Sequence, residues 1–564
     1  MKSILCSLNS KYIHSSLGVW CLLAGSEKFC KTDIKIKVVE GTINETHDLI
    51  IERLMAEKAD IISFSCYIWN ITHVLEIAEQ IKKISPKSTV IFGGPEVSYN
   101  TKERLAQHDF VDFILAGEGE KSFARLMDCL ETGADFSSVA GLAYRGNGKI
   151  FENPVEFLEP EDCVTPYTEK YFAALSNRIA YIESSRGCPF SCAFCLSGRC
   201  GGVRFYPLER TFDEMLKLAT YGVKTIKFVD RTFNCNKKRS IEIFNFIREN
   251  YGKSIPDDVC FHFEIAADIL DDETLEIISK MPLGSVQFEA GIQTLNAETL
   301  AYINRKTNMK RLDENLKKLI SFQNCHVHID LIAGLPLENL ESFIDGFNEA
   351  YYLKSSMLQL GFLKILYGSP MYEDMEKFPC NYTKTPPYEV IDTPWISESE
   401  LDILRGVEDA LERLYNSGRF KRSLEYILGE TGKTPFDVLL EFSTFLKDKS
   451  MLKIPLDKYT ELVYEFYSEV KNVEKEKLRD YLILDRISTN SSAIIPKVLH
   501  VKDERLRKVK AQVIANYSLS AKKHSIAILY TLEKVAFCVY DKKNPVSGEF
   551  EVKMLDFGEF EEIF

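Results

Sequence analysis

The chain contains 564 residues, of which 45% are hydrophobic and 27% are charged, and its formal net charge is −13. This length predicts about three or four domains, the composition is typical of a globular protein, and the charge argues against a protein that coats nucleic acid. Fifteen cysteines are too few for a disulfide scaffold, and neither a cleavable leader nor a bilayer-spanning stretch is evident, so a reducing, cytoplasmic location is expected.

Residues 1–140 alternate short apolar runs with helical patterns, which predicts an α/β domain with a parallel sheet and crossover helices. The predicted strands are 3–8, 35–40, 61–65, 89–92 and 113–115. The predicted helices are 49–58, 71–84 and 121–132, from their apolar spacing.

Three unusual loops follow the ends of predicted strands. They read Ser63-Phe64-Ser65-Cys66-Tyr67-Ile68-Trp69-Asn70, Gly93-Gly94-Pro95-Glu96 and Gly117-Glu118-Gly119-Glu120. Ligands of open parallel sheets bind beyond the carboxyl ends of the strands. Glycines there let the backbone approach a large flat ligand, and hydroxyls can bond to its polar rim. The candidate ligand-binding residues are Ser65, Tyr67, Gly93, Gly94, Gly117, Glu118 and Gly119.

Residues 141–177 have a weak pattern and several X-Pro pairs. Asn153-Pro154, Glu159-Pro160 and Thr165-Pro166 favour extended backbone over helix. A linker between two domains is therefore predicted here.

Cys188, Cys192 and Cys195 form a Cys-x3-Cys-x2-Cys run directly after the predicted strand 179–183. Three thiolates at this spacing can converge on one iron-sulfur cluster and leave one iron without a protein ligand. The alternative is a zinc knuckle, which usually needs a fourth Cys or His. Cys200 is available for that role, but Gly201 and Gly202 behind it are more typical of a loop.

Residues 178–375 predict a second α/β domain, an open, partial (β/α)6 barrel. Its strands are predicted at 179–183, 225–229, 260–265, 285–291, 326–332 and 357–366, and its helices at 212–221, 241–250, 272–280 and 340–353. Polar residues near the carboxyl ends of these strands are site candidates, because such ends gather on one side of a parallel barrel. They are Asp230, Glu264, Gln293, Arg305 and Asp330.

Residues 376–564 predict a mainly helical domain with a terminal hairpin. Helices are expected at 401–416, 421–428, 435–447 and 458–484, with Ser397 as an N-cap and Glu400 three residues later. Residues 525–530 and 535–540 predict the hairpin, and 549–564 an acidic tail. The basic segment 497–523 is interpreted as a solvated helix face, the alternative being a contact for nucleic acid or an acidic partner.

The cysteine run, with Phe194 before the last cysteine, resembles the cluster loop of the radical S-adenosylmethionine (SAM) enzymes. The Gly-Gly-Pro and Gly-Glu-Gly-Glu loops resemble the Rossmann-like cobalamin-binding domain that precedes many of these enzymes. The resemblance implies a [4Fe-4S] cluster, S-adenosylmethionine on its open iron, and cobalamin. The Asp-x-His-x-x-Gly signature is absent, so cobalt is expected to lack a protein histidine. Alternatively, the glycines only serve turns, or the domain has lost its ligand.

The resemblance also implies roles for the polar residues of the barrel. Glu264, Gln293 and Asp330 correspond to contacts with the ribose hydroxyls of S-adenosylmethionine, and Arg305 to a charge partner. Asp230 takes the position of a carboxylate that binds the methionine amino group. In the wider family that strand often ends in Gly-Gly-Glu, whereas here it reads Val229-Asp230-Arg231.

The function implied is methylation of an unactivated carbon through a 5'-deoxyadenosyl radical and methylcobalamin, under anaerobic conditions. A one-electron reductant of the flavodoxin or ferredoxin type would supply the electron, and no membrane is involved. The alternatives are a radical cyclase or rearrangement enzyme, with or without cobalamin, and a non-catalytic cobalamin or redox sensor. Residues 376–564 resemble the extension of an uncharacterised subgroup and are expected to cap the barrel. No substrate is indicated.

Overall fold

The computed structural model describes residues 1–447, 449, 454–492 and 494–564, which divide into two compact units. The first consists of Met1–Gln287, Glu298–Leu312 and Phe362–Pro394, and the second of Phe288–Ala297, Asp313–Gly361 and Trp395–Phe564. The predicted central domain therefore contributes to both units.

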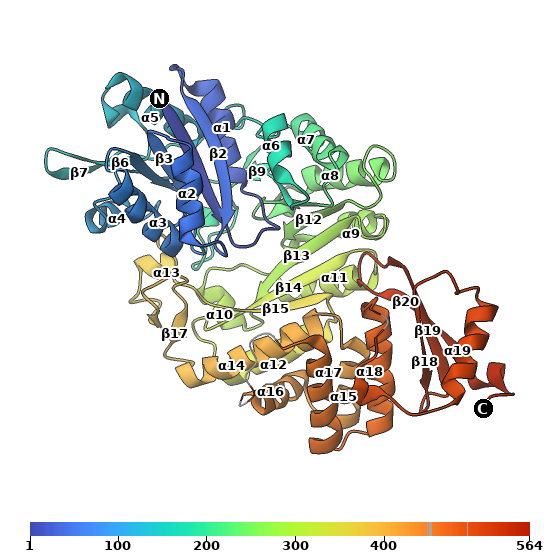
Figure 1. Cartoon of the computed structure of the whole chain (residues 1–564). Helices are drawn as coiled ribbons and strands as arrows, with labels where there is room; N and C mark the ends of the chain where they lie inside the picture. The colour runs from blue at the N-terminus through green and yellow to red at the C-terminus, as the bar shows by residue number, and fades with distance from the viewer. Residues whose placement is uncertain (448, 450–453, 493) are drawn as a thin grey trace. The chain divides into compact units, whose positions relative to one another are not determined.

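The first unit begins with a seven-stranded sheet in the order β2-β1-β3-β4-β5-β6-β7 (Figure 1). Strands β1 to β5 are mutually parallel, as predicted. The chain runs from β1 to β2 on one side of β1 and then crosses to β3 on the other side, so the carboxyl ends of β1 and β3 flank the topological switch point. The elements are β1 Lys2–Asn9, α1 Leu17–Phe29, β2 Lys35–Thr42, α2 His47–Ala56, β3 Ile61–Ser65, α3 Ile71–Ile84, β4 Thr89–Gly93, α4 Thr101–Gln107, β5 Phe113–Leu115 and α5 Gly119–Thr132.

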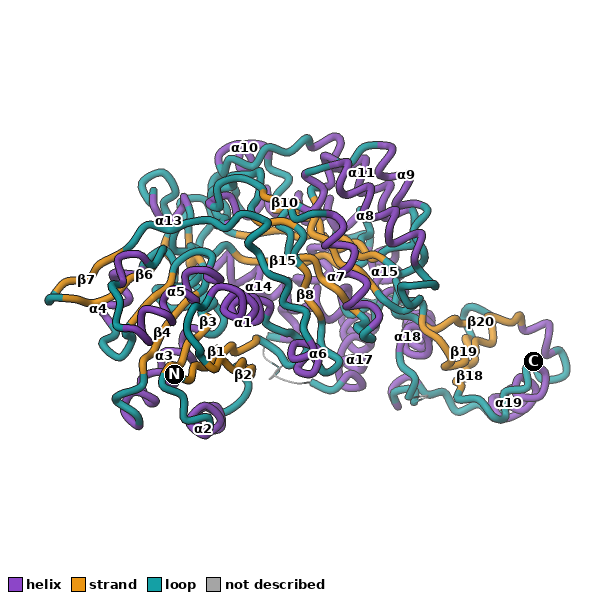
Figure 2. The backbone as a smooth tube through the Cα atoms, turned by 90° about the horizontal axis from the view of Figure 1, so that it is seen from above, coloured by secondary structure: helices purple, strands orange, loops and turns teal. Residues whose placement is uncertain are grey.

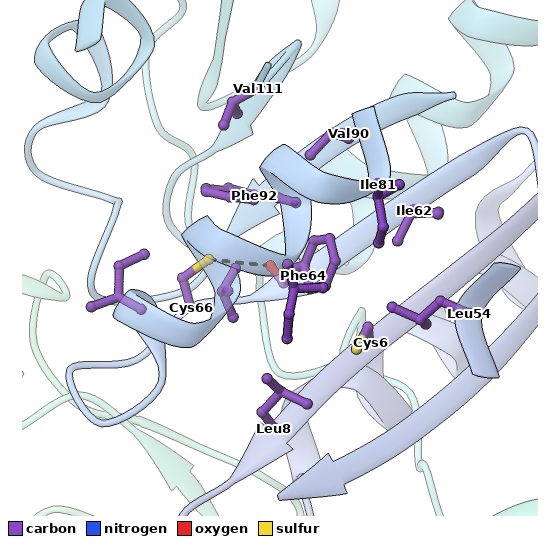
Figure 3. Close-up of a cluster of buried hydrophobic side chains, with 14 of the residues drawn as sticks. Cys6, Leu8, Leu54, Ile62, Phe64, Cys66, Ile81, Val90, Phe92 and Val111 are labelled. Atoms are coloured by element: carbon purple, nitrogen blue, oxygen red, sulfur yellow. Dashed lines mark hydrogen bonds between the residues drawn. The ribbon is translucent and has the colours of Figure 1, made fainter. Parts of the chain in front are cut away.

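Helices α2, α3 and α4 share an apolar core with one face of this sheet. Figure 3 shows its centre, where the rings of Phe64 and Phe92 from neighbouring strands meet edge to face, 5.9 Å apart, close to Ile81 of α3 and Leu54 of α2. Each fully buried side chain of this kind contributes about 1.5–3 kcal/mol. Helices α1 and α5 pack against each other on the other face. The parallel strands are thus buried on both sides, which explains their nearly continuous apolar runs.

Helices α1 and α4 were not predicted. Residues 19–21 and 23–26 of α1 are buried, so the helix has no polar stripe to create a helical period. Helix α4 has only seven residues, too few for a period to be visible.

The prediction that residues 141–177 form a linker is wrong for its first part. β6 Leu142–Gly146 and β7 Lys149–Glu152 form a hairpin that pairs antiparallel with β5 and extends the sheet. Asn147 and Gly148 both have positive φ, 49° and 72°. This is the geometry of a two-residue Asn-Gly hairpin turn, so the dipeptide was the available signal. The remainder contains one short helix, α6 Glu169–Leu175.

All six strands predicted for the central domain are present. The first unit contains β8 Ala180–Ile182, β11 Thr225–Phe228 and β12 Cys260–Ile265, which are neighbours in the parallel order β12-β11-β8. The second contains most of β13 Val286–Gln293, with β14 His326–Ala333 and β15 Met357–Phe362, in the order β15-β14-β13. The other elements are β9 Ser185–Arg186, β10 Arg204–Phe205, α7 Leu208–Thr220, α8 Lys237–Asn250, α9 Asp272–Ser279, α10 Ala297–Tyr302, α11 Met309–Ser321, α12 Leu340–Tyr352, α13 Pro370–Glu373, β16 Asn381–Tyr382 and β17 Val390–Asp392.

The C-terminal region is mainly helical and ends in a small sheet, which Figure 2 shows beside α19. Its elements are α14 Glu398–Leu411, α15 Lys421–Thr431, α16 Pro435–Leu446, α17 Leu456–Glu465, α18 Lys475–Thr489, α19 Arg505–Asn516, β18 His524–Leu529, β19 Lys534–Lys543 and β20 Phe550–Asp556. The basic segment contains α19, which buries Val509 and Val513 in the core against this sheet. Within the part of the chain that the structure describes, no helix has the length and apolar character needed to cross a bilayer.

Two predictions for this region are wrong. The single helix 458–484 is broken between α17 and α18, where Asn472 adopts a left-handed conformation with φ 57° that a helix cannot contain. The acidic tail is not a free tail, because β20 pairs with β19 as a third strand and buries Phe550 and Leu555.

The predicted N-cap is confirmed. The Ser397 hydroxyl accepts the Glu400 N–H, and the Glu400 carboxylate accepts the Ser397 N–H at 2.8 Å. This reciprocal capping box begins α14.

Replacing Ser397 with Ala removes one partner of an otherwise unpaired helix N–H. We expect the first turn of α14 to be destabilised by about 1 kcal/mol, visible as faster amide exchange there by mass spectrometry. Asp402→Asn, one turn further along α14, changes an exposed carboxylate that pairs with Arg405; it is the control and should leave exchange unchanged. Equal exchange in the two variants would contradict the capping role.

Candidate functional site

The three predicted cluster cysteines lie in one loop between β9 and β10. Each sulfur has a polar neighbour: the Thr232 hydroxyl is 3.4 Å from Cys188 Sγ, Arg305 Nη1 is 3.7 Å from Cys192 Sγ, and the Ser197 N–H donates to Cys195 Sγ at 3.4 Å. The N–H groups of Arg305 and Ser197 are directed at sulfur, and such donors stabilise thiolates and tune the potential of a cluster. The donor set therefore fits an iron-sulfur cluster.

The alternative zinc site has no geometric support. One zinc ion would hold its sulfurs about 3.8 Å apart. Among the described residues, the only group of three or more Cys, His, Asp or Glu ligand atoms that all lie within 4.8 Å of one another is Glu289, His328 and Asp330, which contains no cysteine. The sulfurs of Cys188, Cys192 and Cys195 are therefore not all within 4.8 Å of one another. Cys200 lies in the same loop, and burial raises the pKa of its thiol.

Asp230 follows β11 and is almost completely buried. Its carboxylate accepts the Ser184 N–H at 2.9 Å and the hydroxyls of Ser184 and Ser185 at 2.7 and 2.6 Å. Burial raises the pKa of this carboxyl to about 6, against the lowering effect of the serine hydrogen bonds. Asp230 thus holds the segment that leads into the cysteine loop, and its contact with a methionine amino group stays a prediction.

Two further predicted residues lie in the first unit. The Glu264 side chain is partly exposed, with Lys227 Nζ 3.7 Å from its Oε1. Arg305 follows α10 and contacts Cys192. The adjacent Asn304 donates to the Ser191 hydroxyl at 2.7 Å, so this segment supports the cysteine loop directly.

Gln293 and Asp330 belong to the second unit. Gln293 ends β13 in the left-handed region with φ 72°. Asp330 on β14 has its Oδ1 2.9 Å from His328 Nε2, and Glu289 of β13 completes the group. Strand alternation was the available signal for this group, because Glu289 and Gln293, and likewise His328 and Asp330, are an even number of residues apart and share a face.

The loops at the carboxyl edge of the N-terminal sheet present exposed aromatic rings. Trp69 after β3 stacks on Tyr67, with ring centroids 4.3 Å apart, and remains 43% exposed. Tyr12 after β1 is 70% exposed and Tyr99 after β4 is 42% exposed. Exposed rings around a switch point fit a large flat ligand. Tyr12 and Tyr99 were not singled out from the sequence.

The glycines in these loops have a packing role. Gly94 has φ +110°, and a Cβ there would lie 2.5 Å from the Cys66 carbonyl oxygen. Gly117 has φ +80°, and its Cβ would lie 2.5 Å from Val155 Cγ1. Both positions require glycine whatever binds nearby, and the predicted contacts of the loop glycines and of Ser65 with cobalamin stay predictions.

The Glu118 side chain is directed toward two arginines. It accepts hydrogen bonds from Arg204 and from the Leu158 N–H, and Arg186 Nη1 is 3.4 Å from its Oε2. Burial opposes ionisation, but the bonds from Arg204 and Leu158 outweigh it and lower the pKa of Glu118.

Three family models match the chain, and together they extend over most of it. They are the B12 binding domain at residues 6–127, the radical SAM superfamily at 182–349 and a family of proteins of unknown function, DUF4080, at 376–540.

Among curated proteins, the 2-(S-pantetheinyl)-carbapenam-3-carboxylate methyltransferase of Streptantibioticus cattleyicolor is 29% identical over 318 residues, covering 51% of this chain and 44% of that protein. The anaerobic magnesium-protoporphyrin IX monomethyl ester cyclase of Cereibacter sphaeroides is 24% identical over 325 residues, covering 54% and 51%. The chain spans about half the length of these relatives.

A similar fold occurs in the solved structure of the cobalamin-dependent S-adenosylmethionine radical enzyme OxsB with aqua-cobalamin and S-adenosylmethionine bound. The TM-score is 0.59 at 14% identity, with 93% of this chain and 84% of that chain covered. The likeness in fold thus extends well beyond the two matched cofactor domains.

Replacing Cys188, Cys192 or Cys195 with Ala removes a proposed cluster ligand. We expect each variant to lose the broad charge-transfer absorbance and the cleavage of S-adenosylmethionine after anaerobic reconstitution. Cys200→Ala is the matched control from the same loop and should retain both. Loss of iron from the Cys200 variant would show that Cys200 is a ligand.

The raised pKa of Asp230 predicts a pH-dependent stability. The folded state binds this proton more tightly than the unfolded chain, so the stabilisation is fully present below about pH 3.8 and is lost as the pH rises through about 6. In cofactor-free protein, the stability of wild type relative to Asp230→Asn, which cannot titrate, should fall by about 2 to 3 kcal/mol between about pH 4 and pH 7.

The measurement for Asp230 is thermal unfolding in matched buffers. Asp258→Asn removes an exposed carboxylate that pairs with Lys224 and serves as the control. A difference between wild type and Asp230→Asn that stays constant with pH would contradict the raised pKa.

Proposed function

We propose that this chain, which belongs to the radical SAM proteins that carry an N-terminal B12-binding domain, is a methyltransferase that acts on an unactivated carbon. The observation that carries the proposal is that the cysteine loop and the aromatic edge of the B12-binding sheet belong to one compact unit, joined by buried ion pairs between Arg186 and the carboxylates of Glu118 and Glu120. A methyl carrier and a radical generator are useful together only when they face one substrate.

The cofactors are a [4Fe-4S] cluster, S-adenosylmethionine and cobalamin. When bound, they supply the reductive cleavage of S-adenosylmethionine and a transferable methyl group. The protein binds and orients them and excludes water. Cys188, Cys192 and Cys195 would hold the cluster, and the rings around Trp69 would hold the corrin.

The barrel residues are proposed to orient S-adenosylmethionine. Glu264, Gln293 and Asp330 offer carboxylate and amide oxygens that can accept hydrogen bonds from ribose hydroxyls. Arg305, beside Cys192, places a positive charge next to the cluster.

The electron would come from a reductant of the flavodoxin or ferredoxin type. None of the fifteen cysteines forms a disulfide, which supports a reducing compartment such as the cytoplasm.

A second candidate, a radical cyclase, is favoured by one observation: the chain matches a cyclase as well as a methyltransferase over similar lengths. The two functions differ in the fate of the methyl group. A methyltransferase would need a bound cobalamin that can carry a methyl group from S-adenosylmethionine, whereas a cyclase has no need of a methyl donor.

The test is to reconstitute the protein anaerobically with iron, sulfide and hydroxocobalamin, remove the excess and quantify what stays. We expect about one cobalamin per chain and a cob(II)alamin electron paramagnetic resonance spectrum without nitrogen splitting. When a reductant is added in the presence of S-adenosylmethionine, methylcobalamin and 5'-deoxyadenosine should form. Because Trp69 offers a flat apolar face, Trp69→Ala should weaken cobalamin retention about tenfold, a loss of about 1.4 kcal/mol. Trp69→Phe is the matched control and should retain most of it.

Each outcome of this test assigns one function. Absence of cobalamin from protein with an intact cluster would replace the methyltransferase by a cobalamin-free radical enzyme. Bound cobalamin that is never methylated would favour the cyclase, and absence of 5'-deoxyadenosine would leave a non-catalytic sensor.

A further inference from the structure

The neck of the cysteine loop is closed by two strands that place like charges opposite each other. Strands β9 and β10 pair antiparallel on either side of the loop, with Arg186 opposite Arg204 and Ser185 opposite Phe205. All three cluster cysteines lie between these strands. Like charges directly opposite each other destabilise a strand pair, so the neck needs an anion to stay closed.

That anion comes from the B12-binding domain. Glu118 Oε2 lies 3.0 Å from Arg204 Nη1 and 3.4 Å from Arg186 Nη1, and its Oε1 accepts from Arg204 Nη2. The Leu158 N–H donates to the same carboxylate at 2.7 Å. One carboxylate therefore bridges the two arginines that face each other across the neck.

A second carboxylate reinforces the arrangement. Glu120, two residues later, accepts from Arg186 Nη2 at 2.5 Å, and Glu183 accepts from Arg186 Nε at 3.0 Å. The side chains of Arg186, Glu118 and Glu120 are only 13%, 14% and 6% exposed. Charges this far from solvent interact strongly with one another and are costly to leave unpaired.

The other side of the neck is held independently. Asp230 accepts from the backbone and hydroxyl of Ser184 and from the hydroxyl of Ser185, directly before Arg186. Arg239 donates to the carbonyl oxygens of Ser184 and Tyr206. Of these groups, Glu118 and Glu120 come from the B12-binding domain, whereas Asp230 and Arg239 come from the radical SAM domain.

We infer that Glu118 is a positioning residue for the cluster, which neutralises Arg186 and Arg204 across the neck of the cysteine loop, and that Glu120 supports it. The acidic residues of the Gly117–Glu120 loop thereby link the B12-binding domain to the cluster loop. This inference rests on the cluster assignment within the proposed function and is independent of methyl transfer.

The experiment compares the release of iron to a ferrous chelator from reduced, reconstituted full-length variants. Residues that orient metal ligands typically change metal affinity by 10- to 100-fold, so Glu118→Gln should release iron about tenfold to a hundredfold faster. Gln is isosteric and keeps an acceptor for the Leu158 N–H. The control, Glu103→Gln, changes an exposed carboxylate of the same domain that bonds only within α4, to Gln107, and should behave as wild type.

Arg204→Gln separates positioning from simple loss of an ion pair. It breaks the same pair but also removes the like charge, so the neck should stay closed and iron release should remain within about twofold of wild type. Arg204→Gln in the Glu118→Gln background should slow the fast release. If instead Arg204→Gln alone is as fast as Glu118→Gln, the pair is only structural and the inference is wrong.

Two further measurements do not depend on enzyme activity. In cofactor-free protein, trypsin should cut at Arg199 inside the loop faster in Glu118→Gln than in wild type. The thermal unfolding of the control, Glu103→Gln, should be unchanged. In reconstituted protein, Glu118→Gln should retain cobalamin like wild type. If Glu118→Gln retains less cobalamin than wild type but releases iron at the normal rate, Glu118 is a corrin contact and the inference is wrong. If wild type itself binds no cobalamin, only the proposed methyltransferase function is refuted.

Discussion

The pairing of Arg186 in a nearly dry environment is the constraint on which the arrangement of the first unit depends. Its guanidinium is surrounded by the carboxylates of Glu118, Glu120 and Glu183, of which Glu120 is 66 residues away in the chain. A buried charge is tolerated only with partners in place. The observed geometry of the cysteine loop therefore depends on its contacts with the Gly117–Glu120 loop at the end of the N-terminal sheet.

The same sheet provides the rigidity that this pairing needs. Its parallel strands are buried on both faces, so the ends of β1, β3 and β4 are held in fixed positions while the loops beyond them remain open. Trp69 is fixed by stacking on Tyr67 and by an indole N–H donated to the Leu8 carbonyl at 3.2 Å, yet keeps one face exposed. A rigid sheet edge suits cofactor binding, because the side chains that contact the ligand are oriented before the ligand binds.

Local patterns made the strands predictable. The bounds of β3, β5, β12 and α3 agree with the prediction, because each is an apolar run or an amphipathic period that ends abruptly. Failures occurred where local signal and tertiary context differ: α1 is buried too completely to show a period, and β20 is a strand because β19 offers a partner for its acidic sequence. In the site, the motif indicated which cysteines share a loop. It could not reveal that Glu118 meets Arg204, because that pairing depends on how distant segments pack.

The glycines and the glutamates of the Gly117–Glu120 loop have different roles, which changes how such a motif is interpreted. Its first glycine is required by backbone conformation and by the closeness of Val155, while its glutamates face the cysteine loop. In the proposed function, recognition of the corrin would then depend on the exposed rings of other loops, among them Tyr99, which packs against Gly368. The Gly117–Glu120 loop of the B12-binding domain thus contacts the base of the cysteine loop. In the proposed function, a movement of this sheet edge that repositions the corrin would also move Glu118 and Glu120, which contact Arg186 at the base of the cysteine loop.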